Sequence, residues 1–264
     1  MNYLYPQGKP KALTFSYDDG QVFDRRLVEI FNKYGVKATF HLNSGTLGGS
    51  VFIAPEEVKT LFEGHEVSCH GVEHKNLPSI PRPLVMAELA EDRKALEKLS
   101  GGLVQGMSYA FGNYNAEIKE IAKSAGIKYS RTVNDMFGFF PPADFLEWHP
   151  TCHHDKRLME LGENFLRMPP FIELGLMYVW GHSFEFDRNN NWDHIEEFVK
   201  MMSGKDDIWY ATNLEICDYI NATRSQEFSA DGNTIHNPTA ISIWMRVGQE
   251  VVELKPGETR YIGK

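Results

Sequence analysis

Two adjacent carboxylates, Asp18 and Asp19, follow the first short apolar run of the chain and precede Gly20. Acidic side chains that are buried side by side raise each other's pKa unless a cation lies near them. The sequence Asp-Asp-Gly is also ordinary in solvated turns. The pair by itself therefore leaves two interpretations open, a cation site and a surface turn.

The pair His70 and His74 follows another apolar run, residues 67–69. A spacing of four predicts that both imidazoles lie on one face of a helix, close enough to share a metal ion. Two imidazoles and one carboxylate form a three-ligand set that leaves room for water and suits zinc, cobalt or iron. Two surface histidines are the alternative interpretation, which the position after a strand disfavours.

A third histidine, His182, follows Trp180 and Gly181 at the end of a further apolar run. A single histidine at such a position is more often structural than catalytic. All three groups, however, come directly after a predicted strand. Since the carboxyl ends of the strands carry the active site in α/β barrels, we expect these groups to meet at one end of a sheet.

The elements that must position these groups alternate along the chain. Apolar patterns predict strands at residues 12–15, 37–42, 66–69, 106–111, 129–133, 176–180 and 208–212. Amphipathic patterns predict helices at residues 24–34, 55–62, 83–99, 116–125, 156–167, 192–202 and 214–221. This alternation is typical of an α/β fold with a mostly parallel sheet. Short, evenly spaced strands favour a distorted (β/α) barrel of about seven parallel strands, with a doubly wound open sheet as the alternative.

The chain changes character near residue 223, where strand-like runs replace the alternation of strands and helices. These runs are residues 240–247, 250–254 and 260–262. We therefore predict one domain at residues 1–222, the barrel, and a small C-terminal β extension at residues 223–264.

Composition limits the partners. The 264 residues are 42% hydrophobic and 24% charged, which excludes a disordered chain. The net charge of −9 argues against nucleic acid and anionic membranes, because both attract a basic face. The sequence contains no apolar run that approaches the length of a membrane span, and its first residues lack the pattern of a signal peptide. We expect a cytoplasmic protein, with a removed leader peptide as the alternative.

The three motifs together resemble those of the polysaccharide deacetylase family, also called the NodB-homology or carbohydrate esterase 4 family. Residues 14–20 (Thr-Phe-Ser-Tyr-Asp-Asp-Gly), His70-x-x-x-His74 and residues 180–182 (Trp-Gly-His) are similar to its T-F-D-D-G, H-S/T-x-x-H and L-x-H signatures. They occur in the family's order over roughly residues 10–215. The resemblance implies a distorted (β/α)-barrel hydrolase that removes acetyl groups from an acetylated saccharide.

The resemblance also implies a role for each residue of the motifs. Asp19, His70 and His74 would hold the metal, Asp18 would be the general base, and His182 would be the general acid. One divalent metal ion is implied, with zinc expected and cobalt, nickel or iron as alternatives.

The chain departs from the family at its Arg-x-Pro-Tyr-Gly motif, where residues 108–112 read Ser-Tyr-Ala-Phe-Gly. The family's Tyr donates a backbone N–H to the oxyanion. Phe111 can fill this role, because a backbone donor needs no particular side chain. The family's Arg, which steadies the base, is absent, and Arg131 at the end of the next predicted strand is our candidate replacement.

Further residues would support the acid His182. Asp144, in a loose echo of the family's Asp-x-x-Asp-Trp motif, would orient it, while Trp180 would form a wall of the acetyl pocket. Glu185 is a candidate hydrogen-bond partner or a solvated loop acid. The histidine-rich run at residues 149–154 would line the substrate groove, supply a further ligand, or form a polar loop.

Two other functions remain open at this point. One is an amidase of the same fold that acts on a small amide. The other is a carbohydrate-binding protein with an impaired site, which the retained acidic pair disfavours. The sequence does not specify the sugar or the oligomeric state.

Overall fold

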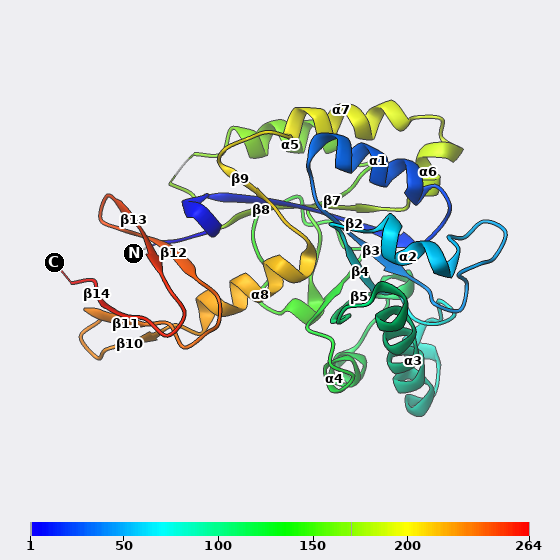
Figure 1. Ribbon diagram of the computed structural model, residues 1–264, viewed down its shortest axis with the longest axis horizontal. Helices are drawn as coiled ribbons and strands as arrows, with labels where there is room; N and C mark the ends of the chain where they lie inside the picture. The colour runs from blue at the N-terminus through cyan, green and yellow to red at the C-terminus, as the bar shows by residue number, and fades with distance from the viewer. Residues whose placement is uncertain (1, 170, 264) are drawn as a thin grey trace.

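The computed structural model describes residues 2–169 and 171–263. Its centre is an eight-stranded parallel sheet in the order β6-β5-β4-β3-β2-β8-β7, with β9 also paired to β2. The strands are β2 (Lys11–Asp19), β3 (Ala38–Leu42), β4 (Glu66–Cys69), β5 (Gly106–Ser108), β6 (Tyr129–Arg131), β7 (Cys152–His153), β8 (Gly175–Gly181) and β9 (Ile208–Tyr210). The sheet curls into a half-barrel (Figure 1), which confirms the predicted fold class.

Helices cover the outside of this curled sheet. They are α1 (Asp24–Tyr34), α2 (Val58–Leu61), α3 (Arg82–Ser100), α4 (Ala116–Ser124), α5 (Leu158–Leu166), α6 (Ser183–Arg188), α7 (Trp192–Met202) and α8 (Asn213–Arg224). Helices α1, α5 and α7 lie together along one side of the sheet, and α3, α4 and α8 lie on the other side (Figure 1). The six-residue helix α6 and the two-residue strand β7 were not predicted.

Strand β2 shows how alternation separates the apolar core from the barrel interior. Phe15 packs outward on Phe31 of α1 and Phe198 of α7, with ring centroids 4.7 and 6.1 Å apart. The next residue, Ser16, faces the interior, where His41 Nε2 lies 2.8 Å from its hydroxyl oxygen. Because side chains alternate across a strand, Asp18 must share this interior side with Ser16.

The segment at residues 148–153 brings the two ends of the sheet together. Trp148 forms an isolated parallel bridge with Arg131 at the end of β6. Four residues further on, Cys152 pairs with Val179 of β8. The segment therefore lies between β6 and β8 and curls the sheet toward closure.

The C-terminal strands form two small antiparallel sheets, and the first strand of the chain belongs to one of them. One sheet contains β1 (Asn2–Leu4), β12 (Ile243–Val247) and β13 (Glu250–Leu254), and the other contains β10 (Glu227–Phe228), β11 (Thr234–His236) and β14 (Thr259–Tyr261). The predicted boundary at residue 222 falls within α8, which ends at Arg224. These strands lie beside α8, away from α3 (Figure 1).

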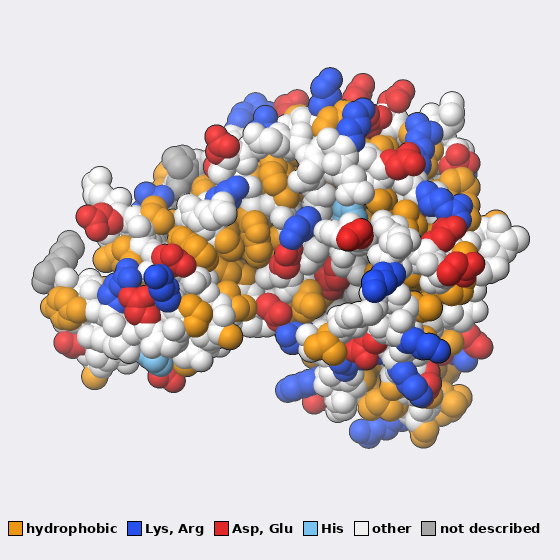
Figure 2. All heavy atoms as spheres, in the orientation of Figure 1, with side chains coloured by type: hydrophobic (Ala, Val, Ile, Leu, Met, Phe, Trp, Pro, Cys, Tyr) orange, Lys and Arg blue, Asp and Glu red, His pale blue; other side chains and the backbone are white. Residues whose placement is uncertain are grey.

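Charged side chains of both signs are interspersed over the face drawn in Figure 2, and the net negative charge is not gathered into one patch there. Among the residues that the structure describes, no helix combines the length and the apolar character needed to cross a bilayer.

Candidate active site

The two carboxylates at the end of β2 lie in different surroundings. Asp18 is buried inside the barrel, with 3% of its surface exposed. Asp19 lies at the rim with its side chain 21% exposed, and its backbone adopts a left-handed φ of 81°. The strand ends here, and the left-handed residue directs the Asp19 carboxylate toward the loop after β4.

The His70–His74 segment is a loop, so the predicted helical face is wrong. Gly71 and His74 have left-handed φ values of 83° and 54°, which an α-helix does not allow. The loop is held from α3, where Asp92 Oδ2 accepts the backbone N–H groups of His70 and Gly71 at 3.1 and 3.0 Å. The two imidazoles nevertheless meet, with ring centroids 4.7 Å apart.

Asp19, His70 and His74 come together as predicted. Asp19 Oδ1 lies 3.6 Å from His70 Nε2 and 3.8 Å from His74 Nε2. All three donor atoms lie within 4.8 Å of one another. Tetrahedral ligands that bind zinc at about 2.0–2.2 Å are separated by roughly 3.3–3.6 Å. The donor set and its spacing therefore fit a small divalent cation.

The orientation of His70 also suits a ligand. Its Nδ1 lies 3.0 Å from the carbonyl oxygen of Ser108 and 2.7 Å from the Ser108 hydroxyl oxygen. The carbonyl oxygen can only accept, and the hydroxyl donates to Asp18, so Nδ1 carries the proton. The Nε2 lone pair is then free on the side of Asp19. Such a hydrogen bond from the distal nitrogen is the usual way in which proteins fix the tautomer of a metal-binding histidine. Burial lowers the pKa of His70, which favours the neutral form that binds metals.

Asp18 has a hydrogen-bond donor on each carboxylate oxygen. Ser108 Oγ donates to Oδ1 at 3.1 Å, and Arg131 Nη2 donates to Oδ2. Burial alone would raise the pKa of Asp18, but the Arg131 guanidinium and nearby imidazoles hold it well below its usual range. Asp18 therefore stays ionised, and its Oδ2 lies 3.8 Å from His70 Nε2, beside the candidate metal site.

Arg131 is fully buried and fixed by three further contacts. Its Nε donates to Ser16 Oγ and its Nη1 to the carbonyl oxygen of Thr132, both at 3.0 Å. The guanidinium also lies over the ring of Trp180, 4.4 Å from the centroid. The structure thus places Arg131 on Asp18, where a replacement for the missing family arginine would have to lie.

His182 follows β8 and contacts Glu185 of α6. Its Nδ1 lies 3.3 Å from Glu185 Oε2, so Nε2 is the nitrogen left for other partners. Burial lowers the pKa of His182, but the hydrogen bond to Glu185 and the charges of Asp18 and Asp19 more than offset it, and the pKa is raised. A charged imidazole at this position can donate a proton.

Of the other predicted residues, Phe111 lies beside this cluster and Asp144 lies away from His182. Phe111 has a left-handed φ of 59° in the 3-10 turn η4 (Ala110–Gly112), and its exposed ring lies 4.5 Å from that of His74. The structure does not bring Asp144 to His182. The Asp144 carboxylate instead accepts the N–H of Leu146 and pairs with Lys119 at 2.5 Å.

Sequence reasoning missed Asp92 and the role of Ser108. Asp92 gave one signal, since it lies among the apolar positions of α3 between Leu89 and Leu96, where a carboxylate needs partners. Trp180, predicted as a pocket wall, is mostly buried, and its indole N–H donates to Asp135 Oδ1 at 2.8 Å. No pattern in the sequence around Asp135 indicated its contact with Trp180.

The curled parallel sheet and the Asp/His cluster at its rim define a (β/α)-barrel with a candidate metal centre. Residues 6–130 match the family model described as polysaccharide deacetylase. This stretch includes Asp18, Asp19, His70 and His74, whereas Arg131 and His182 lie beyond it. The predicted resemblance to the polysaccharide deacetylase family is confirmed.

Several known proteins are similar to this chain. A putative polysaccharide deacetylase of Bacillus subtilis, YxkH, is 23% identical over 125 residues, which are 47% of this chain and 45% of that protein. Chitin deacetylase 1 of Cryptococcus neoformans is 26% identical over 114 residues, 42% of this chain and 23% of that protein. The matched stretch therefore spans less than half of these relatives.

Two solved structures share the fold over most of the chain. A putative polysaccharide deacetylase from Mycobacterium smegmatis has a TM-score of 0.67 at 20% identity, over 85% of this chain and 94% of that one. The PuuE allantoinase has a TM-score of 0.67 at 12% identity, over 83% and 93%. At these identities the likeness concerns the fold alone.

Proposed function

We propose that this chain is a metal-dependent hydrolase that removes acetyl groups from an N- or O-acetylated carbohydrate. The observation that carries the proposal is the meeting of Asp19, His70 and His74, with donor atoms within 4.8 Å of one another, beside the buried Asp18. The curated relatives support the substrate class, since they are described as polysaccharide and chitin deacetylases. Zinc is the ion that we infer, because two imidazoles and one carboxylate form a common catalytic zinc site.

A divalent cation held by Asp19, His70 and His74 would supply polarisation of the acetyl carbonyl and a more acidic water molecule. Asp18 acts as the general base. Its position is fixed by Ser108 and Arg131, one on each oxygen. Because its pKa is held low, the carboxylate is free of a proton at neutral pH and accepts one from the attacking water.

The remaining residues act on the other side of the acetyl group. The Phe111 N–H, in the turn beside His74, donates to the oxyanion, and such a donor contributes about 3 kcal/mol. His182 Nε2 protonates the departing amine or hydroxyl, while Glu185 holds Nδ1 and keeps the ring in place. Trp180, fixed by Asp135, forms a wall of the acetyl pocket.

The proposal is tested by acetate release from a panel of N- and O-acetylated saccharides, with and without a chelator and with zinc added back. We expect release that the chelator abolishes and zinc restores. The variant Asp18→Asn should lose most turnover while keeping its metal. The matched control is Asp187→Asn, an exposed carboxylate in the same protein, which should keep it. Near-full activity of Asp18→Asn would show that the base is misassigned.

A second candidate is an amidase that acts on a small amide with the same residues. The fold does not separate the two candidates, because an allantoinase and the putative deacetylase of Mycobacterium smegmatis share it with this chain at the same TM-score of 0.67. Cyclic ureides and small amides belong in the same substrate panel. Ammonia or ring-opened product without any acetate release would favour this candidate.

A further inference from the structure

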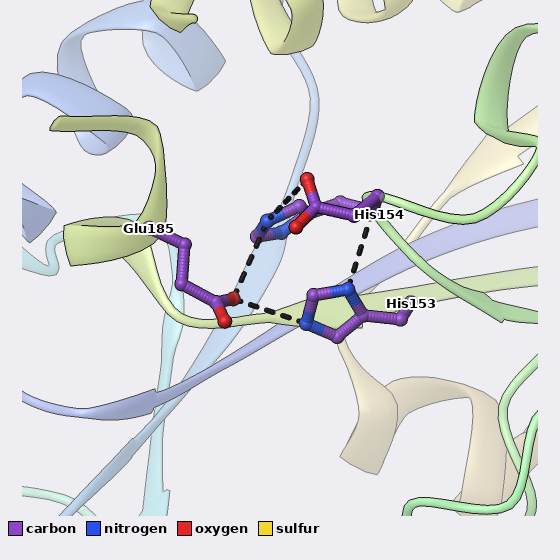
Figure 3. A group of neighbouring side chains, drawn as sticks. His153, His154 and Glu185 are labelled. Atoms are coloured by element: carbon purple, nitrogen blue, oxygen red, sulfur yellow. Dashed lines mark hydrogen bonds and ion pairs between the residues drawn. The ribbon is translucent and has the colours of Figure 1, made fainter. Parts of the chain in front are cut away.

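A second group of metal-binding side chains lies outside the Asp19 cluster. His153 ends β7, His154 and Asp155 follow it, and Glu185 reaches the same point from α6. Figure 3 shows both imidazoles and the Glu185 carboxylate directed toward one another. Each of the four residues offers one donor atom, and these atoms lie within 4.8 Å of one another.

His153 is held as a hydrogen-bond donor to Glu185 and not as a ligand. Its Nδ1 accepts the backbone N–H of Asp155 at 3.2 Å, so the proton of the neutral ring lies on Nε2. The separations around His154 match the edges of a coordination shell. Glu185 Oε2 lies 3.0 Å from His153 Nε2 and 3.4 Å from His154 Nε2. His154 Nε2 lies 3.4 Å from Asp155 Oδ1 as well. Ligands in a tetrahedral zinc site are separated by roughly 3.3–3.6 Å.

His153 and Glu185 pair with each other, but this pair leaves the ring nitrogens of His154 without a hydrogen-bond partner among the described residues. The His154 side chain is fully buried. Buried polar groups in folded proteins nearly always have a partner, and a bound ion can satisfy one that has none within the chain. An imidazole with a free Nε2 beside two carboxylate oxygens is suited to a cation.

The protein also fixes the His154 ring in this orientation. The ring is stacked on Phe186 and on Tyr17, with centroids 4.1 and 5.8 Å away. Its Nδ1 faces Gly181, where a Cβ atom would lie only 2.0 Å away. Gly181 therefore makes the room that His154 occupies, and Nε2 is left to face Glu185.

We propose that His154, Glu185 and Asp155 form a second divalent-cation site, separate from the Asp19 cluster. One imidazole and two carboxylates suit zinc or a similar divalent metal. The same Glu185 oxygen contacts His182 Nδ1, so the ion also positions the proposed acid; this last consequence alone rests on the proposed function.

The test is the number of zinc ions bound per chain, measured by elemental analysis after the metal-free protein is reloaded and free zinc is removed. Wild type should bind two ions. Removing the first site with Asp19→Asn and His74→Gln should leave one, and removing the second with His154→Gln and Glu185→Gln should also leave one. His149→Gln, a histidine of the same loop outside the group, is the matched control and should bind two.

The proposal is overturned if wild type binds one ion that the first pair of changes removes, or if the His154/Glu185 variant still binds two. Should that variant fail to fold, Asp155→Asn alters a more exposed ligand and should weaken the second zinc by at least about tenfold; unchanged affinity of this variant also overturns it. Acetate release measured on the same samples is a separate readout. A chain that binds two ions but releases no acetate keeps this site and loses the proposed function.

Discussion

Replacing Arg131 by Met removes the buried cation beside the proposed base while roughly keeping side-chain volume. In wild type the guanidinium donates to Asp18, Ser16 and the Thr132 carbonyl oxygen, and all of these partners lie in the interior. After the change Asp18 remains buried but loses its strongest favourable interaction. Burial then dominates, and the pKa of Asp18 rises.

The size of the effect follows from the exposure of the pair. Asp18 and Arg131 have side chains that are 3% and 0% exposed. Breaking a buried pair by removing one partner costs about 3–5 kcal/mol of unfolding free energy. The pair Arg25–Glu57 is also an arginine–carboxylate ion pair, with two guanidinium nitrogens on the carboxylate, but its side chains are 46% and 39% exposed. The control Arg25→Met should therefore cost no more than about 1 kcal/mol.

Two measurements follow from this reasoning. Urea unfolding at neutral pH gives the loss of stability for Arg131→Met and for its control. The pH dependence of kcat/KM for acetate release gives the ionisation of the base, and its acidic limb should move to higher pH in Arg131→Met only. A loss below about 1 kcal/mol, together with an unchanged acidic limb, would refute the role assigned to Arg131.

Three further changes test other contacts. Asp92→Ala removes the acceptor of two backbone N–H groups in the His70 loop, so zinc affinity in a chelator competition should fall by about 10–100-fold, and unchanged affinity would contradict this support. Asp24→Asn addresses a buried carboxyl whose pKa burial raises from 3.8 to about 8. The folded chain keeps this proton between pH 4 and 8, where the unfolded chain loses it. The free energy of unfolding of the wild type should therefore fall as pH rises over this range, by up to about 6 kcal/mol. Urea unfolding of the variant should show a flatter pH profile, and a profile identical to that of the wild type would contradict the assignment. Ser108→Ala removes the hydroxyl that donates to Asp18 and lies 2.7 Å from His70 Nδ1, but it keeps the carbonyl oxygen that also accepts from Nδ1. We therefore expect kcat/KM to fall by about 10–100-fold with zinc still bound, whereas loss of zinc would show that the carbonyl oxygen alone does not hold His70.

The sequence was informative where function depends on the end of a strand. Asp18, His70 and His182 each follow a predicted strand, and parallel strands end at one edge, so their shared location was predictable. The helical geometry of the His70–His74 pair was not correct, because Gly71 allows a left-handed turn that spacing alone does not reveal.

Contacts across the sheet were harder to predict. Arg131 was a candidate only because the family arginine was missing, and its place on Asp18 depends on the curl of the sheet from β2 to β6. Glu185 was predicted as a candidate partner of His182, but its contact with His153 depends on the position of α6 beside β7. Such contacts join distant parts of the chain, and no local pattern specifies them.

Every proposed catalytic role depends on one divalent cation bound by Asp19, His70 and His74 beside an ionised Asp18. Anomalous diffraction at the zinc absorption edge, from crystals grown with zinc, locates such an ion without any assumption about the substrate. We predict a peak at about 2.0–2.2 Å from Asp19 Oδ1 and from both Nε2 atoms. A map without a peak at these three atoms, or with the Asp19 carboxylate turned away from both imidazoles, would contradict the proposed metal centre.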